Sequence, residues 1–148
     1  TTIKQMLESI QQQFNVKVRE KNITLSLCDT DLHIRCDSKW TVEALGNIVD
    51  NAIKYTACGG NVQIKVEQYS FFVKIDIIDD GIGIEKEEIS KIFGRFYRSL
   101  SVADQPGVGI GLFLVREIIQ AQKGYIKVTS KRGKGSTFSV FLPIAKKE

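Results

Sequence analysis

The chain has 148 residues, of which 43% are hydrophobic and 26% are charged, and its net charge is +4. This composition excludes a disordered or collagen-like chain, and no apolar run reaches the roughly 20 residues of a membrane-spanning helix. Three cysteines without Cys-x-x-Cys spacing indicate neither a disulfide framework nor a zinc site, and a single histidine, His33, excludes a Ser/His/Asp triad. The positive charge suits anionic ligands such as nucleotides, and no nucleic-acid partner is expected.

Hydrophobic periodicity predicts helices and strands in mixed order. A helix is expected over Ile3–Val18, and Ser38 is the expected N-cap of a long helix that ends near Tyr55. The remaining elements are expected to be strands Ile23–Leu27, Leu32–Cys36, Val62–Tyr69 and Phe72–Ile78, a short helix Glu85–Phe93, a loop Arg95–Val108, a helix Gly109–Lys123, and strands Tyr125–Ser130 and Ser136–Leu142. This order predicts a single α+β domain over residues 1–148. We expect a two-layer sandwich with three main helices on one face of a mixed sheet of about five strands.

The long helix has two different faces. The face expected to pack on the sheet is apolar and consists of Val42, Leu45, Val49, Ala52 and Ile53. On the opposite side, Asn47, Asn51 and Lys54 lie at i, i+4 and i+7 along one line. Amide oxygens can ligate Mg²⁺ and a lysine can pair with phosphate, so this line suits a metal-bound polyphosphate. The alternative is an ordinary solvated helix face.

The motif Asp79-x-Gly81-x-Gly83 follows a strand that is rich in isoleucine. An aspartate at the end of a buried strand needs a partner, and the two glycines allow a ligand to approach the backbone closely. A carboxylate here can accept a hydrogen bond from the exocyclic amine of adenine, whereas guanine presents a carbonyl at that position. The alternative is a simple turn built from Asp and Gly.

A second glycine motif, Gly107-Val108-Gly109-Ile110-Gly111-Leu112, opens the last helix. Glycines at a helix N-terminus expose backbone N–H groups and a favourable dipole to phosphates. The spacing is neither that of the Rossmann fingerprint nor that of a P-loop.

Together these motifs resemble the sequence boxes of sensor histidine kinases. Asn47–Tyr55 looks like their asparagine box, and Asp79–Ile84 and Gly107–Leu112 look like their two glycine boxes. Ile92–Arg98 is similar to their phenylalanine box, and Gly133–Phe138 with Leu142-Pro143 resembles their C-terminal glycine-threonine segment. All five occur in family order between Ser38 and Pro143. The resemblance implies the Bergerat-type ATP-binding fold that gyrase, heat-shock chaperone and mismatch-repair ATPases share.

The resemblance also implies roles for individual residues. Asn51, with Asn47, would ligate Mg²⁺, Lys54 would contact phosphate, and Tyr55 would lie near the adenine or ribose of ATP. Asp79 would bind the adenine amine, and Thr137 would hydrogen-bond nearby. Gly81, Gly83 and Ile84 would line the base pocket, whereas a mobile lid with Gly107, Val108, Gly109, Ile110, Gly111 and Leu112 would cover the phosphates. Arg98, or alternatively Arg95, would approach the γ-phosphate, with Phe93 and Phe96 as lid anchors.

The resemblance implies an ATP-dependent protein-histidine kinase whose acceptor histidine is outside this chain. The acceptor would lie on a dimerisation hairpin of the same protein, and residues 1–20 would include a linker helix from that hairpin. A response regulator is the expected phosphate recipient. The parent is expected to be a homodimer at the cell membrane, with this domain in the cytoplasm. His33 lies in a predicted strand on its solvent side, so it is not the acceptor.

Three other functions share this pocket. Gyrase-type and chaperone-type ATPases carry a glutamate four residues before the metal-binding asparagine, where Asn47 stands here, and an amide cannot act as a base. A serine kinase of the anti-sigma type is disfavoured by Phe93–Arg98 and by the terminal Leu-Pro. A degenerate nucleotide-binding scaffold is disfavoured because the asparagines, aspartate and glycines are all present, although Val108 replaces a small hydroxyl residue.

Overall fold

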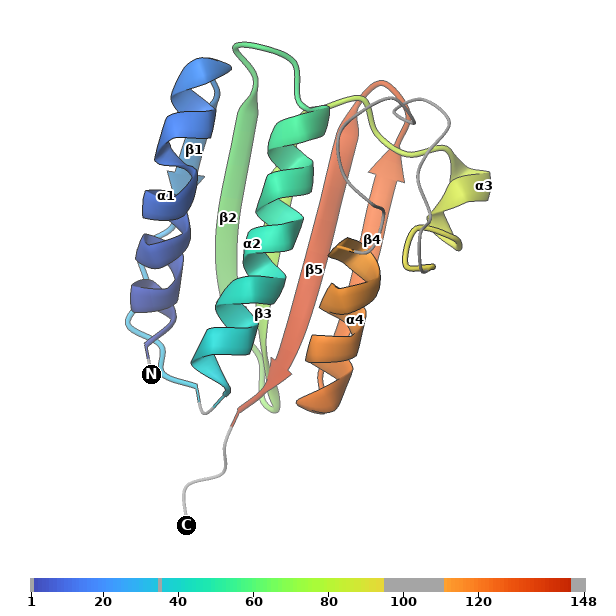
Figure 1. Cartoon of the computed structure of the whole chain (residues 1–148). Helices are drawn as coiled ribbons and strands as arrows, with labels where there is room; N and C mark the ends of the chain where they lie inside the picture. The colour runs from blue at the N-terminus through green and yellow to red at the C-terminus, as the bar shows by residue number, and fades with distance from the viewer. Residues whose placement is uncertain (1, 35, 95–110, 145–148) are drawn as a thin grey trace.

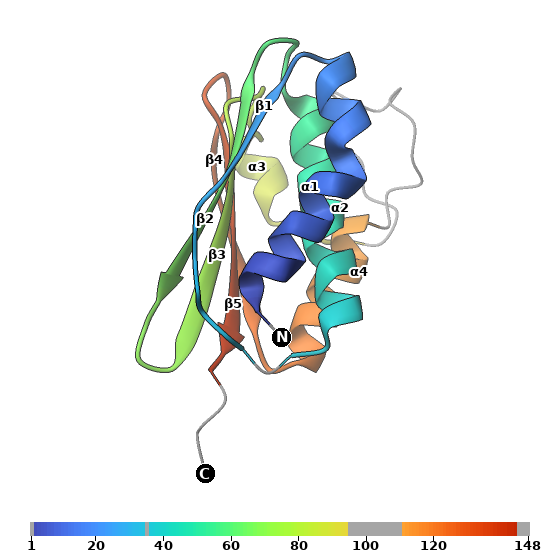
Figure 2. The same cartoon turned by 90° about the vertical axis from the view of Figure 1, so that its left-hand side faces the viewer.

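The computed structural model describes residues 2–34, 36–94 and 111–144, which form two layers. Helices α1 (Ile3–Glu20), α2 (Ser38–Tyr55) and α4 (Gly111–Ala121) make up one layer. A five-stranded sheet makes up the other, and the view along its edge shows all three helices on the same face (Figure 2). The predicted α+β sandwich is therefore confirmed.

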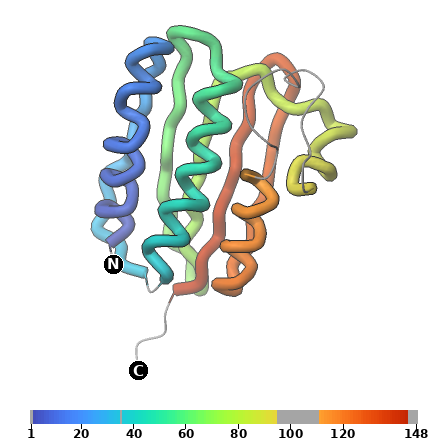
Figure 3. Tube along the Cα trace, in the orientation of Figure 1, coloured from blue at the N-terminus to red at the C-terminus, as the bar shows by residue number. Residues whose placement is uncertain are grey.

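The sheet is mixed, and its strand order is β1-β2-β3-β5-β4. Its members are β1 (Thr24–Leu27), β2 (Asn61–Gln68), β3 (Phe72–Asp79), β4 (Tyr125–Lys131) and β5 (Gly135–Pro143). Only β1 and β2 pair in parallel, and the other neighbours are antiparallel. The tube view shows β1 behind α1 at one edge of the sheet and β4 beside α4 at the other (Figure 3). This order places β3 and β5 next to each other in the middle.

The core lies between the two layers. Helix α1 contributes a buried stripe, α2 contributes the apolar face predicted for it, and alternate residues of β3 are buried beneath the helix layer. The fully buried side chains include Ile3, Leu7, Ile10, Leu45, Val49, Ile75 and Ile77. Burial of each such side chain is worth about 1.5–3 kcal/mol, so α1 is an integral part of this core. The assignment of residues 1–20 to a linker helix stays a prediction.

Two local predictions near the start of α2 are wrong. Residues 32–36 do not form a strand; among the described residues of this segment only His33 makes a β-bridge, with Thr2. The alternation that suggested a strand has another cause: Ile34 is buried while His33 is exposed, because the segment packs along the start of α1. The N-cap of α2 is Asp37 rather than Ser38, since Asp37 Oδ1 accepts a hydrogen bond from the Trp40 N–H at 3.2 Å.

The helices near the glycine motifs are shorter than predicted. Helix α3 covers Lys86–Ile89 only, and turns continue it to residue 93. Helix α4 ends at Ala121, because Lys123 adopts the left-handed conformation with φ of 62°. No helix within the described ranges combines the length and apolar character needed to cross a membrane.

Candidate functional site

The polar edge of α2 lies beside the start of α4. Asn47, Asn51, Lys54 and Tyr55 are all half-buried, whereas most of the apolar stripe is fully buried. A Cβ atom placed on Gly111 would lie 4.0 Å from Asn47 Oδ1, which brings that amide to the first turn of α4. The structure therefore brings Asn47, the first residue of the predicted line on α2, to one predicted lid residue, Gly111.

Lys54 is held by a residue that the sequence analysis did not single out. Its ammonium group lies 3.2 Å from Asp50 Oδ2, and Asp50 Oδ1 accepts a hydrogen bond from Lys17 Nζ at 2.9 Å. Burial raises the pKa of Asp50, but the hydrogen bond from Lys17 and the charge of Lys54 outweigh burial, so its pKa is lowered. The i,i+4 spacing of Asp50 and Lys54 was readable in the sequence, but Lys17 is 33 residues from Asp50.

Asp79 is a buried carboxylate at the end of β3, with 8% of its surface exposed. Its Oδ1 accepts a hydrogen bond from the Gly81 N–H at 2.9 Å. Burial raises the pKa of Asp79, the backbone N–H groups of Gly81 and Ser136 partly oppose this, and the charge of Asp80 raises it further. The net pKa lies above the ordinary value of 3.8, so the charged form of this group is poorly compensated by the protein alone.

The glycines of this turn allow two close backbone contacts. A Cβ atom at Gly81 would lie 2.4 Å from the Tyr55 carbonyl oxygen, which also accepts a hydrogen bond from the Ile82 N–H at 3.1 Å. At Gly83, which has φ of +74°, a Cβ atom would lie 2.1 Å from the Lys131 carbonyl oxygen. At both glycines, protein backbone lies where a Cβ atom would stand, so close packing within the chain requires glycine here; close approach by a ligand stays a prediction. The turn is thereby docked on the C-terminal end of α2 and on β4.

Ser136, rather than Thr137, stands beside Asp79. The two residues are register partners between β3 and β5, and the Ser136 side chain is buried. Thr137 pairs with Ile78, and strand alternation places its side chain on the other face of the sheet from Asp79. Thr137, which was predicted to hydrogen-bond near the base, therefore does not lie beside Asp79. The signal was present in the sequence, since Ser136 has the same parity as the buried Phe138, Val140 and Leu142.

A serine network ties β4 and β5 to the same turn. The Ile84 N–H donates to Ser130 Oγ at 2.8 Å, and Ser130 Oγ lies 2.7 Å from Ser136 Oγ. Ser130 Oγ also lies 3.0 Å from the Gly135 carbonyl oxygen, to which it can donate. The network fixes Ile84, a predicted pocket residue, relative to Asp79.

Part of the predicted lid can be located. Phe93 is half-buried, and the guanidinium carbon of Arg116 on α4 lies 5.7 Å from its ring centroid. Leu112 packs against the core from the first turn of α4. Other predicted residues lie outside the described part of the chain, namely Arg95, Phe96, Arg98, Gly107, Val108, Gly109 and Ile110.

The donor set on α2 suits a magnesium ion that is carried by phosphates. Among residues 2–34, 36–94 and 111–144, no cluster of three or more His, Cys, Asp or Glu side chains could hold a metal. Two amide side chains on α2 offer oxygens instead: Asn47, beside the start of α4, and Asn51, one helical turn further along α2. Mg²⁺ commonly takes one or two protein oxygens together with substrate phosphates and water, so these residues fit that ion.

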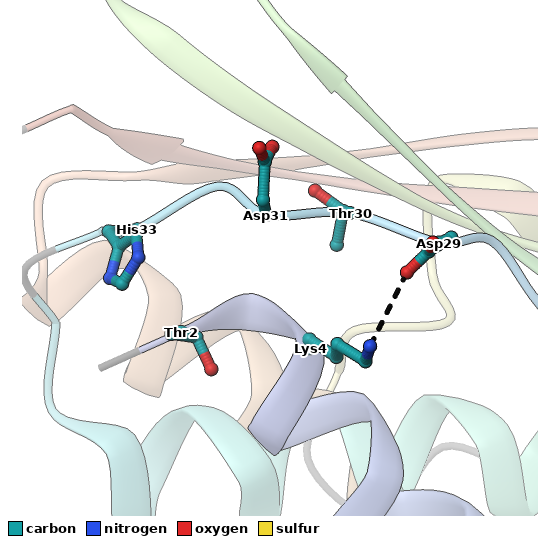
Figure 4. Close-up of a pocket in the computed structure, with 6 residues that line it drawn as sticks. All are labelled: Thr2, Lys4, Asp29, Thr30, Asp31 and His33. Atoms are coloured by element: carbon teal, nitrogen blue, oxygen red, sulfur yellow. Dashed lines mark ion pairs between the residues drawn. The ribbon is translucent and has the colours of Figure 1, made fainter.

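An open pocket of about 490 Å³ lies elsewhere, at the start of α1. Figure 4 shows Lys4 of α1 reaching toward Asp29, with 3.6 Å between Nζ and Oδ1, and the exposed His33 on the same extended segment as Asp29. The ends of α2 and β3 that carry the residues described above lie at the opposite end of the sandwich (Figure 1). This pocket contains none of the predicted site residues.

Comparison with known proteins agrees with this geometry. The family model described as "Histidine kinase-, DNA gyrase B-, and HSP90-like ATPase" matches residues 36–146. The chain belongs to this family. The sensor histidine kinase WalK of Bacillus subtilis is 38% identical over 122 residues, which are 80% of this chain and 20% of WalK. The sensor protein kinase PmrB of Pseudomonas aeruginosa is 34% identical over 139 residues, or 93% of this chain and 29% of PmrB.

Solved members of the family have the same fold. The mycobacterial sensor histidine kinase MprB superimposes with a TM-score of 0.84 at 26% identity, covering 97% of this chain and 95% of that one. The catalytic domain of the histidine kinase ThkA gives 0.83 at 26% identity with the same coverage. The chain spans less than a third of WalK or PmrB. Its recognition as the ATP-binding catalytic domain of a sensor histidine kinase is confirmed.

Proposed function

We propose that this domain binds Mg²⁺·ATP and transfers the γ-phosphate to a histidine on a separate dimerisation domain, for relay to a response regulator. The family match supports ATP as the substrate. One observation carries the proposal further: α2 joins two chemically different ends of one site. Its last residue, Tyr55, holds the turn that follows Asp79, and its polar edge at Asn47 meets the start of α4.

The Asp79 end is proposed to select adenine. A buried carboxylate with a raised pKa is stabilised by any donor that reaches it, and the exocyclic amine of adenine is such a donor. Guanine presents a carbonyl there and would be repelled. Ser136 takes the place that the sequence analysis gave to Thr137, because its side chain lies on the same side of the sheet as Asp79.

The other end is proposed to bind the metal and the phosphates. Asn51 and Asn47 offer amide oxygens to Mg²⁺, Lys54 offers an ammonium group, and Gly111 opens an 11-residue helix whose first N–H groups suit an anion. Tyr55 contacts the adenine or ribose. The remaining assignments rest on the resemblance, with Arg98 toward the γ-phosphate and Gly107, Val108, Gly109 and Ile110 in the lid.

The chemistry asked of the chain is positioning and charge stabilisation. A neutral imidazole nitrogen of the acceptor attacks the γ-phosphorus of Mg²⁺-bound ATP without needing a strong base. The bond from this phosphorus to the β–γ bridging oxygen breaks, and ADP leaves. Asn47 stands where related hydrolases carry a glutamate, and its amide cannot take a proton from water. The domain therefore holds ATP without hydrolysing it rapidly, which preserves the phosphoryl group for the histidine.

The proposal extends to the whole parent protein. We infer a homodimer in which residues 1–20 continue from the dimerisation hairpin, with this domain in the cytoplasm and the parent at the cell membrane. Helix α1 is suited to connect the hairpin with this domain. Its last turn packs on α2, and its first turn lies at the other end of the sandwich.

A radiolabelled ATP assay tests the reaction. The chain alone should bind Mg²⁺·ATP, hydrolyse it very slowly and incorporate no label. Addition of the dimerisation hairpin of the parent kinase should give acid-labile label on the hairpin, and Arg98→Ala should depress this transfer more than it depresses ATP binding. Rapid multiple-turnover hydrolysis by the chain alone, or acid-stable label on a serine of an added partner, would contradict the proposal.

A further inference from the structure

The last turn of α1 is tied to the end of α2 by polar contacts. Lys17 Nζ donates to Asp50 Oδ1 at 2.9 Å. Lys21 Nζ donates to the carbonyl oxygens of Ile53 at 2.8 Å and of Lys54 at 3.1 Å. Helix α1 lies outside residues 36–146, which the family model matches, so these contacts are additions to that core.

Asp50 is shared between two ammonium groups. Lys17 reaches one carboxylate oxygen, and Lys54 lies 3.2 Å from the other. The side chain of Asp50 is only 23% exposed, compared with 55% for Lys17. A carboxylate this far removed from water is costly to leave unpaired. Asp50 therefore keeps Lys54 unless another cation compensates its charge.

We propose that Lys17 is a positioning residue for the phosphate end of the nucleotide site, because it neutralises Asp50 when Lys54 turns from Asp50 to the phosphates. The inference rests on the proposed role of Lys54. Without Lys17, the release of Lys54 would leave Asp50 unpaired, and the competition for Lys54 would favour Asp50 over the nucleotide. Lys21 Nζ donates to two backbone carbonyl oxygens of α2, so it holds the helix end without entering this exchange.

A double-mutant cycle separates this exchange from direct electrostatic attraction between Lys17 and the phosphates of ATP. Lys17→Gln should weaken ATP binding about two- to fivefold, the range expected when a partly exposed ion pair is lost. Asp50→Asn should bind ATP at least as tightly as the wild-type chain, because the Asp50 carboxylate no longer competes with the phosphates for Lys54. Lys17→Gln should then have no effect in the Asp50→Asn background. Calorimetric titration with ATP measures all four proteins, and adenosine, which lacks phosphates, should bind equally to each.

Two variants control for charge and for folding. Lys4→Gln removes the same charge from the same helix at a side chain that is 57% exposed, but its partner Asp29 is 91% exposed and lies at the other end of α1 (Figure 4). This variant should leave ATP affinity unchanged. Lys17→Arg should retain wild-type affinity, because a guanidinium group can also neutralise Asp50. Thermal unfolding of each variant checks that the fold is intact.

The outcomes distinguish this inference from the proposed function. Equal weakening by Lys17→Gln in both backgrounds, or no weakening in the wild-type background, would overturn the role of Lys17 while ATP binding stands. Failure of the wild-type chain to bind ATP would overturn the proposed function itself, and this inference with it.

Discussion

The two ends of the candidate site are built in different ways. At the Asp79 end, positions follow from backbone contacts: the β3–β5 register places Ser136 beside Asp79, and the turn after it is pressed against the Tyr55 and Lys131 carbonyl groups. At the Asn47–Lys54 end, half-buried side chains stand on one helix edge, and one of them, Lys54, is in an ion pair with Asp50. The first end is suited to recognising one rigid base. At the second end, our proposal is that Lys54 exchanges Asp50 for the phosphates when the nucleotide binds.

The largest effect, on the free energy of unfolding, is expected where a backbone contact at the Asp79 end is broken. Gly83 and Gly133 both have positive φ, +74° and +85°, but a Cβ atom at Gly83 would lie 2.1 Å from Lys131 O, while one at Gly133 would meet nothing within 4 Å. Gly133→Ala should cost about 1 kcal/mol for the left-handed conformation. Gly83→Ala should cost about 4 kcal/mol, since β4 must also be displaced. Urea unfolding measures both, and equal losses would show that this end is not rigid.

Asp79→Asn should cause the next largest effect. A hydrogen bond to a charged group contributes about 1.5–3 kcal/mol, so the loss in ATP affinity should be about ten- to hundredfold. Calorimetry with ATP and GTP on both proteins measures it, and the wild-type chain should bind GTP more weakly than ATP. Equal wild-type affinity for the two nucleotides would remove Asp79 from base recognition.

Asn51→Ala tests the Asn47–Lys54 end of the site. The variant should lose the Mg²⁺-dependent part of ATP affinity, about tenfold for one ion–amide contact, and should bind adenosine as the wild-type chain does. Titrations in Mg²⁺ and in a chelator, with circular dichroism as the control for folding, provide the measurement. Unchanged binding of Mg²⁺·ATP would make Asn51 an ordinary solvated helix residue.

The smallest effect is the change of stability and of adenosine affinity with pH. Burial, first of all, raises the pKa of Asp79 above 3.8, so on acidification the folded chain takes up this proton before the unfolded chain does. This residue therefore adds stability at low pH, and that contribution is lost as the pH rises through the raised pKa. The affinity for adenosine should instead fall on acidification, because protonated Asp79 no longer accepts the hydrogen bond from the adenine amine. The fall should be at most about 1.4 kcal/mol per pH unit.

The control for this pH effect is the Asp79→Asn variant, whose adenosine affinity should not follow the same curve. A wild-type affinity for adenosine that stays constant from neutral pH down to the start of acid unfolding would argue against a hydrogen bond between Asp79 and the base.

Much of the fold was predictable because its signals are local. The two faces of α2 and the five strands appear as periodicity within each segment, and the structure confirms them. The strand predicted for residues 32–36 is absent from the described part of this segment, because alternating hydrophobicity shows only that one side of a segment is buried. Here that side packs along α1, and the segment does not join the sheet. Periodicity alone cannot distinguish these two surroundings.

The site was predictable in part for the same reason. Asn47, Asn51 and Lys54 share an edge because helical spacing requires it. The position of Ser136 beside Asp79 depends on register between two strands, and the ion pair of Lys17 with Asp50 joins residues 33 positions apart. Contacts of this kind arise from tertiary packing. The parity of Ser136 indicates which face of its strand it occupies, but no local signal shows that its neighbour is Asp79 or that Lys17 reaches Asp50.

The most direct test of the account is a crystal structure of the chain with Mg²⁺ and a non-hydrolysable ATP analogue. We expect the adenine amine within hydrogen-bond distance of the Asp79 carboxylate, Mg²⁺ on the Asn51 amide oxygen, and Lys54 turned from Asp50 toward the phosphates. Adenine bound away from Asp79, or phosphates placed away from the Asn47–Lys54 edge of α2, would contradict it.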